Sequence, residues 1–169
     1  MTVVKPPTPL VPLLTSPSAP RPWIFLAGSI EGGTAEPWQA AVESALTDAH
    51  GTVLNPRRDA WDSTWEQTKD NPLFREQVEW ELFGQERADL VAMYFQPGTK
   101  APITLLELGL CAGRQPLVLC CPQGFWRKGN VDLVAERYGI RQAATLQEMI
   151  DVIGYVSLRS FGIGEGNER

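Results

Sequence analysis

Short apolar runs alternate with helical patterns along most of this chain, and that alternation limits the folds open to it. The runs are residues 23–27, 52–54, 89–95 and 116–121. Such runs, bounded by glycine, proline or polar residues, are typical of strands buried on both faces of a sheet. Strands that alternate with helices predict a parallel sheet covered on both sides. We therefore expect an α/β three-layer sandwich with a five-stranded parallel sheet, flavodoxin-like or Rossmann-like.

The rest of the chain sets the expected domain boundaries. Residues 1–22 contain seven prolines and no helical or strand period, which predicts a disordered or extended arm. Residues 131–138 are a possible fifth strand, and Thr145 is the expected start of a last helix. A single α/β domain is therefore predicted over residues 23–161, and residues 162–169 are predicted to be a frayed tail.

Composition narrows the classes of partner. The net charge is -5 and no basic patch with interleaved aromatic residues occurs, which argues against a nucleic-acid polymer. No apolar run is long enough to span a membrane, and no apolar signal segment is expected at the start. The three cysteines, Cys111, Cys120 and Cys121, lack a spacing typical of metal sites. We expect reduced thiols, a cytoplasmic protein, no membrane partner, no metal and no cofactor.

One carboxylate lies inside the most apolar helical pattern, residues 101–113. Glu107 has leucines on both sides, and a glutamate is rarely buried unless it is paired. Pro102 suits the first turn of this helix and Gly113 suits its end. The helix N-terminus favours an ionised Glu107, whereas desolvation raises its pKa. Glu107 is therefore a candidate nucleophile, and a structural glutamate that caps the backbone or pairs with an arginine is an equal alternative.

Polar or glycine-rich loops follow the expected strands. They are residues 28–33, 57–67, 96–101 and 125–130. Because the carboxyl ends of parallel strands meet at one edge of a sheet, we expect these loops to converge on one cleft. The first loop either presents backbone N–H groups to a phosphate or hydroxyl or is a plain tight turn, and it lacks the dinucleotide-binding pattern. Trp61 and Trp65 either stack on a planar ring or pack together at the surface.

Residues 72–87 are the next expected helix, which Asn71-Pro72 introduces. The helical period predicts one shared face from Phe74, Val78, Leu82 and Gln85. Of the glutamates in this helix, only Glu81 lies beside that face, which makes it a functional candidate. An ion pair between Glu81 and Arg57 or Arg58 is the structural alternative.

Several of these segments together resemble the nucleoside 2-deoxyribosyltransferase family, in its deoxyribosyltransferase-like branch. The resemblance extends over about residues 23–150. It is carried by Phe25-Leu-Ala-Gly-Ser-Ile30, Asn55-Pro-Arg-Arg-Asp59, Trp61-Asp62, Trp65-Glu-Gln67, the Ala88-Asp89 strand, Thr104-Leu-Leu-Glu-Leu-Gly109 and Phe125-Trp-Arg-Lys-Gly-Asn130.

The resemblance implies a retaining transfer of a 2-deoxyribosyl group between nucleobases, without a cofactor, in a homo-oligomer. Glu107 takes the place of the nucleophile, and Glu81 takes that of an acid that positions it or handles a proton. The residues implied in substrate binding are Gly28 and Ser29 at the sugar end, Asp59, Trp61, Asp62 and Gln67 around the base, and Asn130, which reaches sugar hydroxyls in its own or a neighbouring subunit's site.

The chain departs from the family pattern at three positions. Ala101 and Ile103 replace an Asp and a Gly that precede the glutamate in better-known members, which predicts different sugar contacts. Glu31 stands where the related monophosphate N-glycosidases carry a basic residue, which favours nucleosides over nucleotides as substrates. Two further functions remain open: an N-glycosidase of nucleosides or nucleoside 5′-monophosphates, and a nucleotide-binding module without catalysis.

Overall fold

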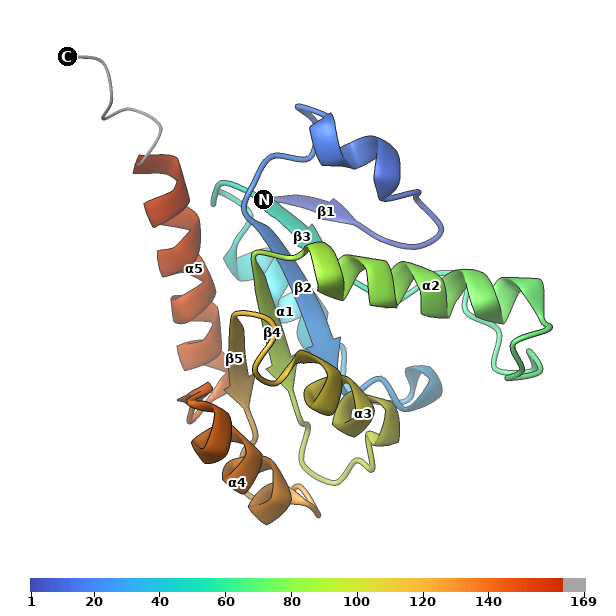
Figure 1. Cartoon of the computed structure of the whole chain (residues 1–169), viewed down its shortest axis with the longest axis vertical. Coiled ribbons are helices and arrows are strands. Elements are labelled where there is room, and N and C mark those ends of the chain that lie inside the picture. The colour runs from blue at the N-terminus through green and yellow to red at the C-terminus, as the bar shows by residue number, and fades with distance from the viewer. Residues whose placement is uncertain (163–169) are drawn as a thin grey trace.

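A parallel sheet runs through the middle of the molecule, with helices on both faces (Figure 1). The structure is a computed structural model that describes residues 1–162, with side chains described as far as Ser160. The strands are β1 (Thr2–Val4), β2 (Trp23–Gly28), β3 (Thr52–Leu54), β4 (Leu90–Tyr94), β5 (Leu117–Cys120) and β6 (Arg141–Ala143). They pair in the order β1-β3-β2-β4-β5-β6, and all pairs are parallel. Without β1 this order is that of flavodoxin, so the predicted fold class is confirmed.

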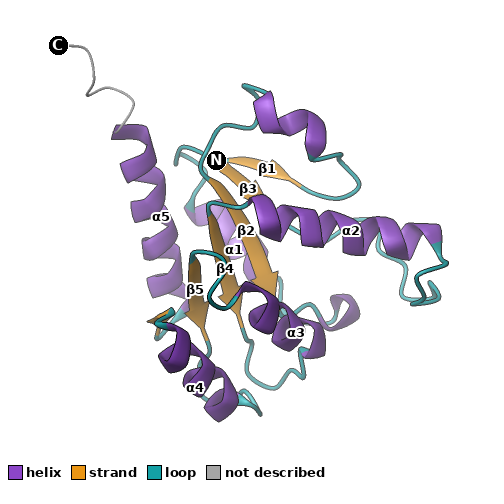
Figure 2. Cartoon of the chain, in the orientation of Figure 1, coloured by secondary structure: helices purple, strands orange, loops and turns teal. Residues whose placement is uncertain are grey.

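Two groups of helices cover the sheet (Figure 2). The helices α1 (Trp38–Ala45) and α5 (Leu146–Gly162) pack on one face. The helices α2 (Pro72–Arg87), α3 (Pro102–Cys111) and α4 (Lys128–Tyr138) pack on the other. None of the helices within residues 1–162 is long and apolar enough to cross a bilayer.

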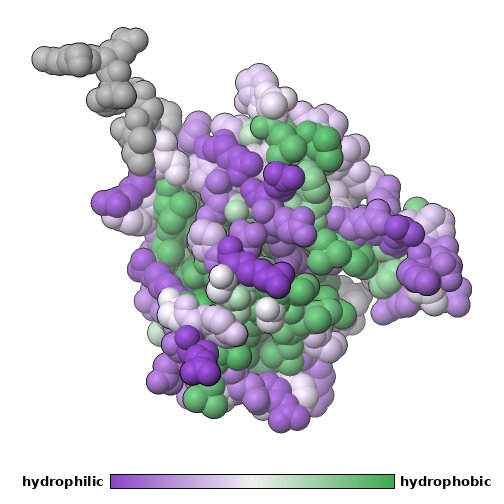
Figure 3. Space-filling view, in the orientation of Figure 1, coloured by the Kyte–Doolittle hydropathy of each residue, from purple (hydrophilic) through white to green (hydrophobic). Residues whose placement is uncertain are grey.

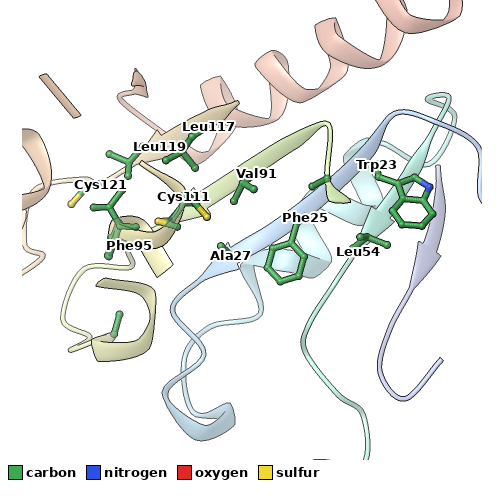
Figure 4. Close-up of a cluster of buried hydrophobic side chains, with 14 of the residues drawn as sticks. Trp23, Phe25, Ala27, Leu54, Val91, Phe95, Cys111, Leu117, Leu119 and Cys121 are labelled. Carbon is green, nitrogen blue, oxygen red and sulfur yellow. The ribbon is translucent and has the colours of Figure 1, made fainter. Parts of the chain in front are cut away.

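Successive residues of each inner strand point to opposite faces of the sheet. In β2, Phe25 packs on the side of α2 and α3, whereas Ile24 and Leu26 pack on the side of α1 and α5. Figure 4 shows the first of these clusters, in which Phe25, Val91 and Leu119 project from three neighbouring strands. Burial on both faces explains why β2, β4 and β5 are continuous apolar runs.

The segment expected to be a disordered or extended arm is part of the domain. Its β1 pairs in parallel with β3, and a 3-10 helix (η1, Val11–Thr15) follows. Leu10 and Ala19 are buried, and the carbonyl of Thr8 accepts a hydrogen bond from Trp80 Nε1 at 2.9 Å. A three-residue strand is too short to show a period, and the prolines of this segment all lie outside β1. Within residues 1–162 the sheet therefore has six strands, one more than expected.

The expected fifth strand at residues 131–138 is wrong, because these residues form most of α4. Val131 and Ala135 are buried at helical spacing, and Lys128 pairs with Asp132 one turn later at 2.8 Å. Gly139, with φ 62°, ends the helix in the left-handed conformation. The strand at this edge is β6, whose residues Arg-Gln-Ala carry no apolar pattern. The last helix begins at Leu146, next to the expected Thr145. Residues 163–169, most of the predicted tail, lie outside the described residues.

Candidate active site

The connections that leave the carboxyl ends of β2, β3, β4 and β5 lie at one edge of the sheet, as parallel strands require. Hydrogen bonds join them to one another. Arg57 Nη2 donates to Gly33 O at 2.9 Å, Gly98 N donates to Gly124 O at 3.2 Å, and Trp126 Nε1 donates to Lys100 O at 3.0 Å. Loops far apart in the sequence are therefore held as one surface.

Glu107 lies on α3, next to α2 and almost fully buried at 8% exposed. Its Oε1 accepts a hydrogen bond from Gln85 Nε2 at 2.5 Å. The Cys111 thiol donates to Gln85 Oε1 at 3.4 Å, which fixes the amide so that its nitrogen faces Glu107. A side chain on each of two helices thus holds the carboxylate in one orientation. The partner of Glu107 is a glutamine, not the arginine considered as a structural alternative.

Glu81 lies on α2 and is oriented in a similar way. Gln77 Nε2 donates to Glu81 Oε1 and to Pro56 O, both at 2.8 Å. The expected ion pair with an arginine is not formed among the described residues, because Arg58 pairs with Glu76 instead and Arg57 donates to backbone carbonyls. Gln77, Glu81 and Gln85 are spaced one turn apart, so α2 presents a polar stripe toward α3.

Burial dominates the electrostatics of the two carboxylates. Desolvation raises the pKa of Glu107 to about 8; the nearby Glu81 adds to the rise and the Gln85 hydrogen bond opposes it. Desolvation also raises the pKa of Glu81 to about 7, against the hydrogen bond from Gln77. Desolvation therefore outweighs the helix N-terminus at Glu107. Because ionisation of each acid disfavours ionisation of the other, the pair holds a proton near neutral pH and titrates as a unit.

A third carboxylate caps the helix that carries Glu107. Glu31 Oε1 accepts hydrogen bonds from Lys100 N at 2.9 Å and Ala101 N at 2.6 Å, at the positive end of α3. Both Glu31 and Ala101 have positive φ, 50° and 43°, a conformation that costs energy for residues other than glycine. The first loop thus already places a negative charge where a bound anion would otherwise lie.

Gly28 and Ser29 join the ends of β2 and β4. Gly28 has φ 151°, and a Cβ there would lie 2.4 Å from Tyr94 O, so only glycine fits. Ser29 is fully buried, and its hydroxyl bonds to Thr99 Oγ1 at 2.8 Å and accepts from Gln96 N at 3.0 Å. These predicted substrate residues thus shape the loop from within.

The predicted base-binding residues lie in the loop between β3 and α2, which extends past the start of α2 (Figure 1). Trp61 and Trp65 contact each other with ring centroids 5.2 Å apart. Asp62 is exposed, and hydrogen bonds from the side chain and backbone of Thr64 lower its pKa. Asp59 pairs with Lys5 at 3.0 Å, and Gln67 is exposed. Within residues 1–162 this loop makes no hydrogen bond or ion pair with Glu107.

Asn130 is an exposed residue of α4. Trp126, just before α4, lies between two cations: Lys100 Nζ and Arg127 Cζ lie 4.7 Å and 4.3 Å from its ring centroid. Its ring is about half exposed and covers the chain that leads into α3. The sequence analysis named this tryptophan only as part of the segment from Phe125 to Asn130 and gave it no role of its own.

Sequence reasoning missed Gln77 and Gln85 as partners of the two acids. The expected shared face of α2 placed Leu82 inside, yet Leu82 is 41% exposed while Gln77 and Gln85 are buried. The spacing of Gln77, Glu81 and Gln85 at intervals of four residues could have indicated that the three side chains share one face of the helix.

Comparison with known families decides the assignment. A profile described as nucleoside 2-deoxyribosyltransferase-like matches residues 21–125, more than half of the chain. This chain belongs to that family. The match includes the glycine loop, Glu81 and Glu107, and it ends at Phe125, before Asn130. A search of curated proteins gives no match. The resemblance to the nucleoside 2-deoxyribosyltransferase-like family is therefore confirmed.

Proposed function

We propose that this protein transfers 2-deoxyribosyl groups between nucleobases through a covalent intermediate on Glu107. The observation that carries the proposal is the pair formed by the buried Glu107 and the partly buried Glu81, each held by a glutamine of α2 and each with a raised pKa. Titratable groups perturbed by burial and by each other are typical of functional sites. Membership of the nucleoside 2-deoxyribosyltransferase-like family supports the same chemistry.

The first half-reaction forms a glycosyl ester. A Glu107 oxygen bonds to the anomeric carbon while the bond from that carbon to the base nitrogen breaks, and its electron pair leaves with the base. Glu107 has the higher pKa of the pair and holds its proton in the free protein, so the reaction requires that proton to pass to Glu81, which then gives it to the departing base. The ester resembles the intermediate of retaining glycosidases.

The second half-reaction reverses these steps with another base. A nitrogen of the incoming base attacks the anomeric carbon from the opposite side, and the ester oxygen leaves as the Glu107 carboxylate. The proton released by the incoming base returns to Glu81. If water attacks instead, the products are the free sugar and a base, which is the N-glycosidase reaction.

The substrate proposed is a nucleoside rather than a nucleotide. Glu31 already occupies the backbone N–H groups of Lys100 and Ala101, so a substrate phosphate would meet a negative charge there. The loop of residues 57–67 is proposed to hold the base through its tryptophans and carboxylates, and Asn130 is proposed to reach the sugar. The protein is proposed to work as a cytoplasmic homo-oligomer, and its three buried cysteines are free thiols.

The test is base exchange. The full chain is incubated with a mixture of deoxynucleosides and a different free base, and new nucleosides are sought by chromatography. We expect exchange products with the wild type and a loss of several powers of ten in Glu107→Gln, which keeps shape and hydrogen bonding but loses the charge. Free sugar without exchange products would favour the N-glycosidase.

The matched control is Glu86→Gln, which changes an exposed glutamate of α2 and should keep full activity. A 2-fluoro-2-deoxy nucleoside should slow both half-reactions, so the mass of one sugar should accumulate on the peptide that contains Glu107. If folded Glu107→Gln retains wild-type activity per molecule, the nucleophile assignment is wrong.

A further inference from the structure

The side-chain amide of Gln85 lies between two side chains of α3, and both of its ends are engaged. Its Nε2 donates to Glu107 Oε1 at 2.5 Å, and its Oε1 accepts a hydrogen bond from the Cys111 thiol at 3.4 Å. Glu107 and Cys111 are four residues apart, so they project from the same face of α3 toward α2. All three side chains are buried. The contacts form a short chain of hydrogen bonds from the thiol to the carboxylate.

A side-chain amide can take two orientations of nearly the same shape, and its hydrogen bonds decide between them. With Nε2 toward Glu107, the amide donates to a carboxylate; with Oε1 toward Glu107, it accepts from a protonated carboxyl group. Packing leaves the choice open, because a cavity of about 100 Å³ between α2 and α3 borders both Gln85 and Cys111. The thiol makes the choice, since in the reversed orientation its S–H would face the N–H groups of the amide.

The other acid of the pair does not depend on such a donor. Gln77 Nε2 donates to Glu81 Oε1 and also to Pro56 O, so a backbone carbonyl fixes the orientation of that amide. The side chain of Gln85 forms no third hydrogen bond within residues 1–162, so its orientation depends on the thiol.

The thiol of Cys111 suits this role because it remains a donor. Burial raises the pKa of Cys111 to about 11, and the neighbouring Glu107 adds to the rise. The thiol therefore keeps its proton over the range in which Glu107 and Glu81 titrate, with pKa values of about 8 and about 7. Within the described residues, Glu81 of α2 and Cys111 of α3 are the titratable groups that act on Glu107. A protonated thiol is a poor nucleophile, so a hydrogen-bonding role fits it better than a chemical one.

We propose that Cys111 is a positioning residue of the active site: through Gln85, its S–H group favours Glu107 as a carboxylate and so directs the proton of the pair to Glu81. This inference rests on the proposed function, in which ionised Glu107 attacks the sugar and Glu81 protonates the departing base. Cys111 acts on Glu107 through the amide and takes no part in the bonds that form and break.

The test measures the ionisation of Glu107 in the free protein by nuclear magnetic resonance. The full chain is labelled with ¹³C at the glutamate carboxyl carbons, and the Glu107 signal is identified by its disappearance in Glu107→Gln. Cys111→Val removes the donor and leaves no additional space for water, so the pKa of Glu107 should rise by about 0.5 or more. Cys111→Ser keeps a donor and should titrate as the wild type does. The pH at which kcat/KM reaches half its maximum should follow the measured pKa.

Two comparisons separate this role from a structural one. Looser packing alone would admit water beside Glu107 and lower its pKa, which is the opposite direction. In a Gln85→Met background, Cys111→Val should leave the pKa of Glu107 unchanged, because the amide that links the two side chains is gone. The matched control is Cys120→Val, at a buried cysteine on the opposite face of the sheet, which should also leave it unchanged. Cys111→Ala repeats the titration with a smaller side chain in case valine prevents folding.

Three outcomes would overturn the proposal: the pKa of Glu107 is unchanged or lower in Cys111→Val, serine raises it as far as valine does, or valine raises it equally without the Gln85 amide. The proposed function fails separately. If the titrations behave as expected but no exchange products form, the reaction is wrong, and the control of Glu107 by Cys111 holds. If exchange occurs and the titrations do not differ, only this inference is rejected.

Discussion

Glu107 is the residue at which protonation and stability are most closely linked. Its pKa in the folded chain, about 8, is above its ordinary value of 4.5, because burial penalises the charged form. A carboxylate with a raised pKa contributes stability below pH 4.5, and this contribution is lost as pH rises toward about 8. Protonation of this one side chain should therefore be measurable without a substrate.

The first prediction compares unfolding free energies of the wild type and Glu107→Gln in urea at pH 5 and pH 8. The variant cannot ionise at this position, so its stability relative to the wild type should rise between the two pH values. Glu86→Gln should show no such change. Parallel pH profiles for the wild type and Glu107→Gln would mean that the pKa of Glu107 is not raised.

The second prediction concerns Gln85 as a positioning residue. Its hydrogen bond lowers the pKa of Glu107, so Gln85→Met should raise that pKa further. If ionised Glu107 is the nucleophile, the pH at which kcat/KM reaches half its maximum should move upward in the variant. A variant that loses activity equally at every pH would assign Gln85 a structural role only.

At the scale of elements, the close approach of α2 to β2 sets where Glu81 lies. Gly84 permits it, because a Cβ at this position would be 2.8 Å and 2.9 Å from two ring atoms of the fully buried Phe25. The ring is itself packed against Trp80, with centroids 6.1 Å apart. A side chain at residue 84 would therefore push α2 away from the sheet.

The third prediction is that Gly84→Ala lowers the free energy of unfolding by about 1–3 kcal/mol, the usual cost of overpacking. The matched control is Gly109→Ala in α3, where a Cβ would meet nothing within 4 Å. The control should raise stability by roughly 0.5–1 kcal/mol, because alanine suits a helix interior better than glycine. Equal effects of the two substitutions in denaturant titrations would contradict the packing argument.

The elements that could be predicted from sequence are those buried on both sides. The strands β2, β4 and β5 have continuous apolar runs because both of their faces are covered. In contrast, β1 and β6 are three-residue edge strands whose partners define them, so no local pattern marks them. The buried face of α2 was also predicted incorrectly. A pattern of apolar residues does not identify glutamines that are buried through their hydrogen bonds.

The candidate site could likewise be predicted only in part from the sequence. Glu107 stands out as an acid among leucines, and Glu81 stands beside an apolar face. Their glutamine partners and the cap formed by Glu31 depend on contacts between α2, α3 and the first loop. Such contacts link residues far apart in the sequence, and spacing alone does not reveal them.

At the scale of the whole molecule, α3 has an uncovered apolar stripe. Ile103, Leu106 and Leu110 recur at helical spacing and are 60%, 60% and 39% exposed. Figure 3 shows apolar side chains gathered over this part of the surface. The stripe is on the helix that carries Glu107, so a partner subunit on it would lie close to the site.

The fourth prediction is that the protein forms a homo-oligomer through this stripe. Ile103→Glu combined with Leu106→Glu should yield the mass of one chain by light scattering at micromolar concentration. Leu158→Glu, at a 72% exposed position of α5, should leave the mass unchanged. If the wild type itself has the mass of one chain, the prediction of a homo-oligomer is wrong.

The fifth prediction is that the first residues are needed for stability. A chain shortened to begin at Pro20 loses the pairing of β1 with β3, the buried Leu10 and the hydrogen bond from Trp80 to Thr8 O. Its melting temperature should fall by at least ~5 °C. Leu10→Ala removes one of these contacts and should lower the free energy of unfolding by about 2–5 kcal/mol in denaturant titrations. An unchanged melting temperature of the shortened chain would show that the segment is dispensable.

The sheet ends on both sides in very short strands, β1 and β6, of three residues each. An outer strand recruits another chain through its free backbone groups, and three residues offer too few of them to start such a ladder. Pro6 and Pro7, close behind β1, cannot donate backbone hydrogen bonds and prevent that edge from growing longer. Lateral stacking into fibrils is therefore disfavoured, and crowded solutions of this protein should remain free of cross-β aggregates as long as the first strand stays in place.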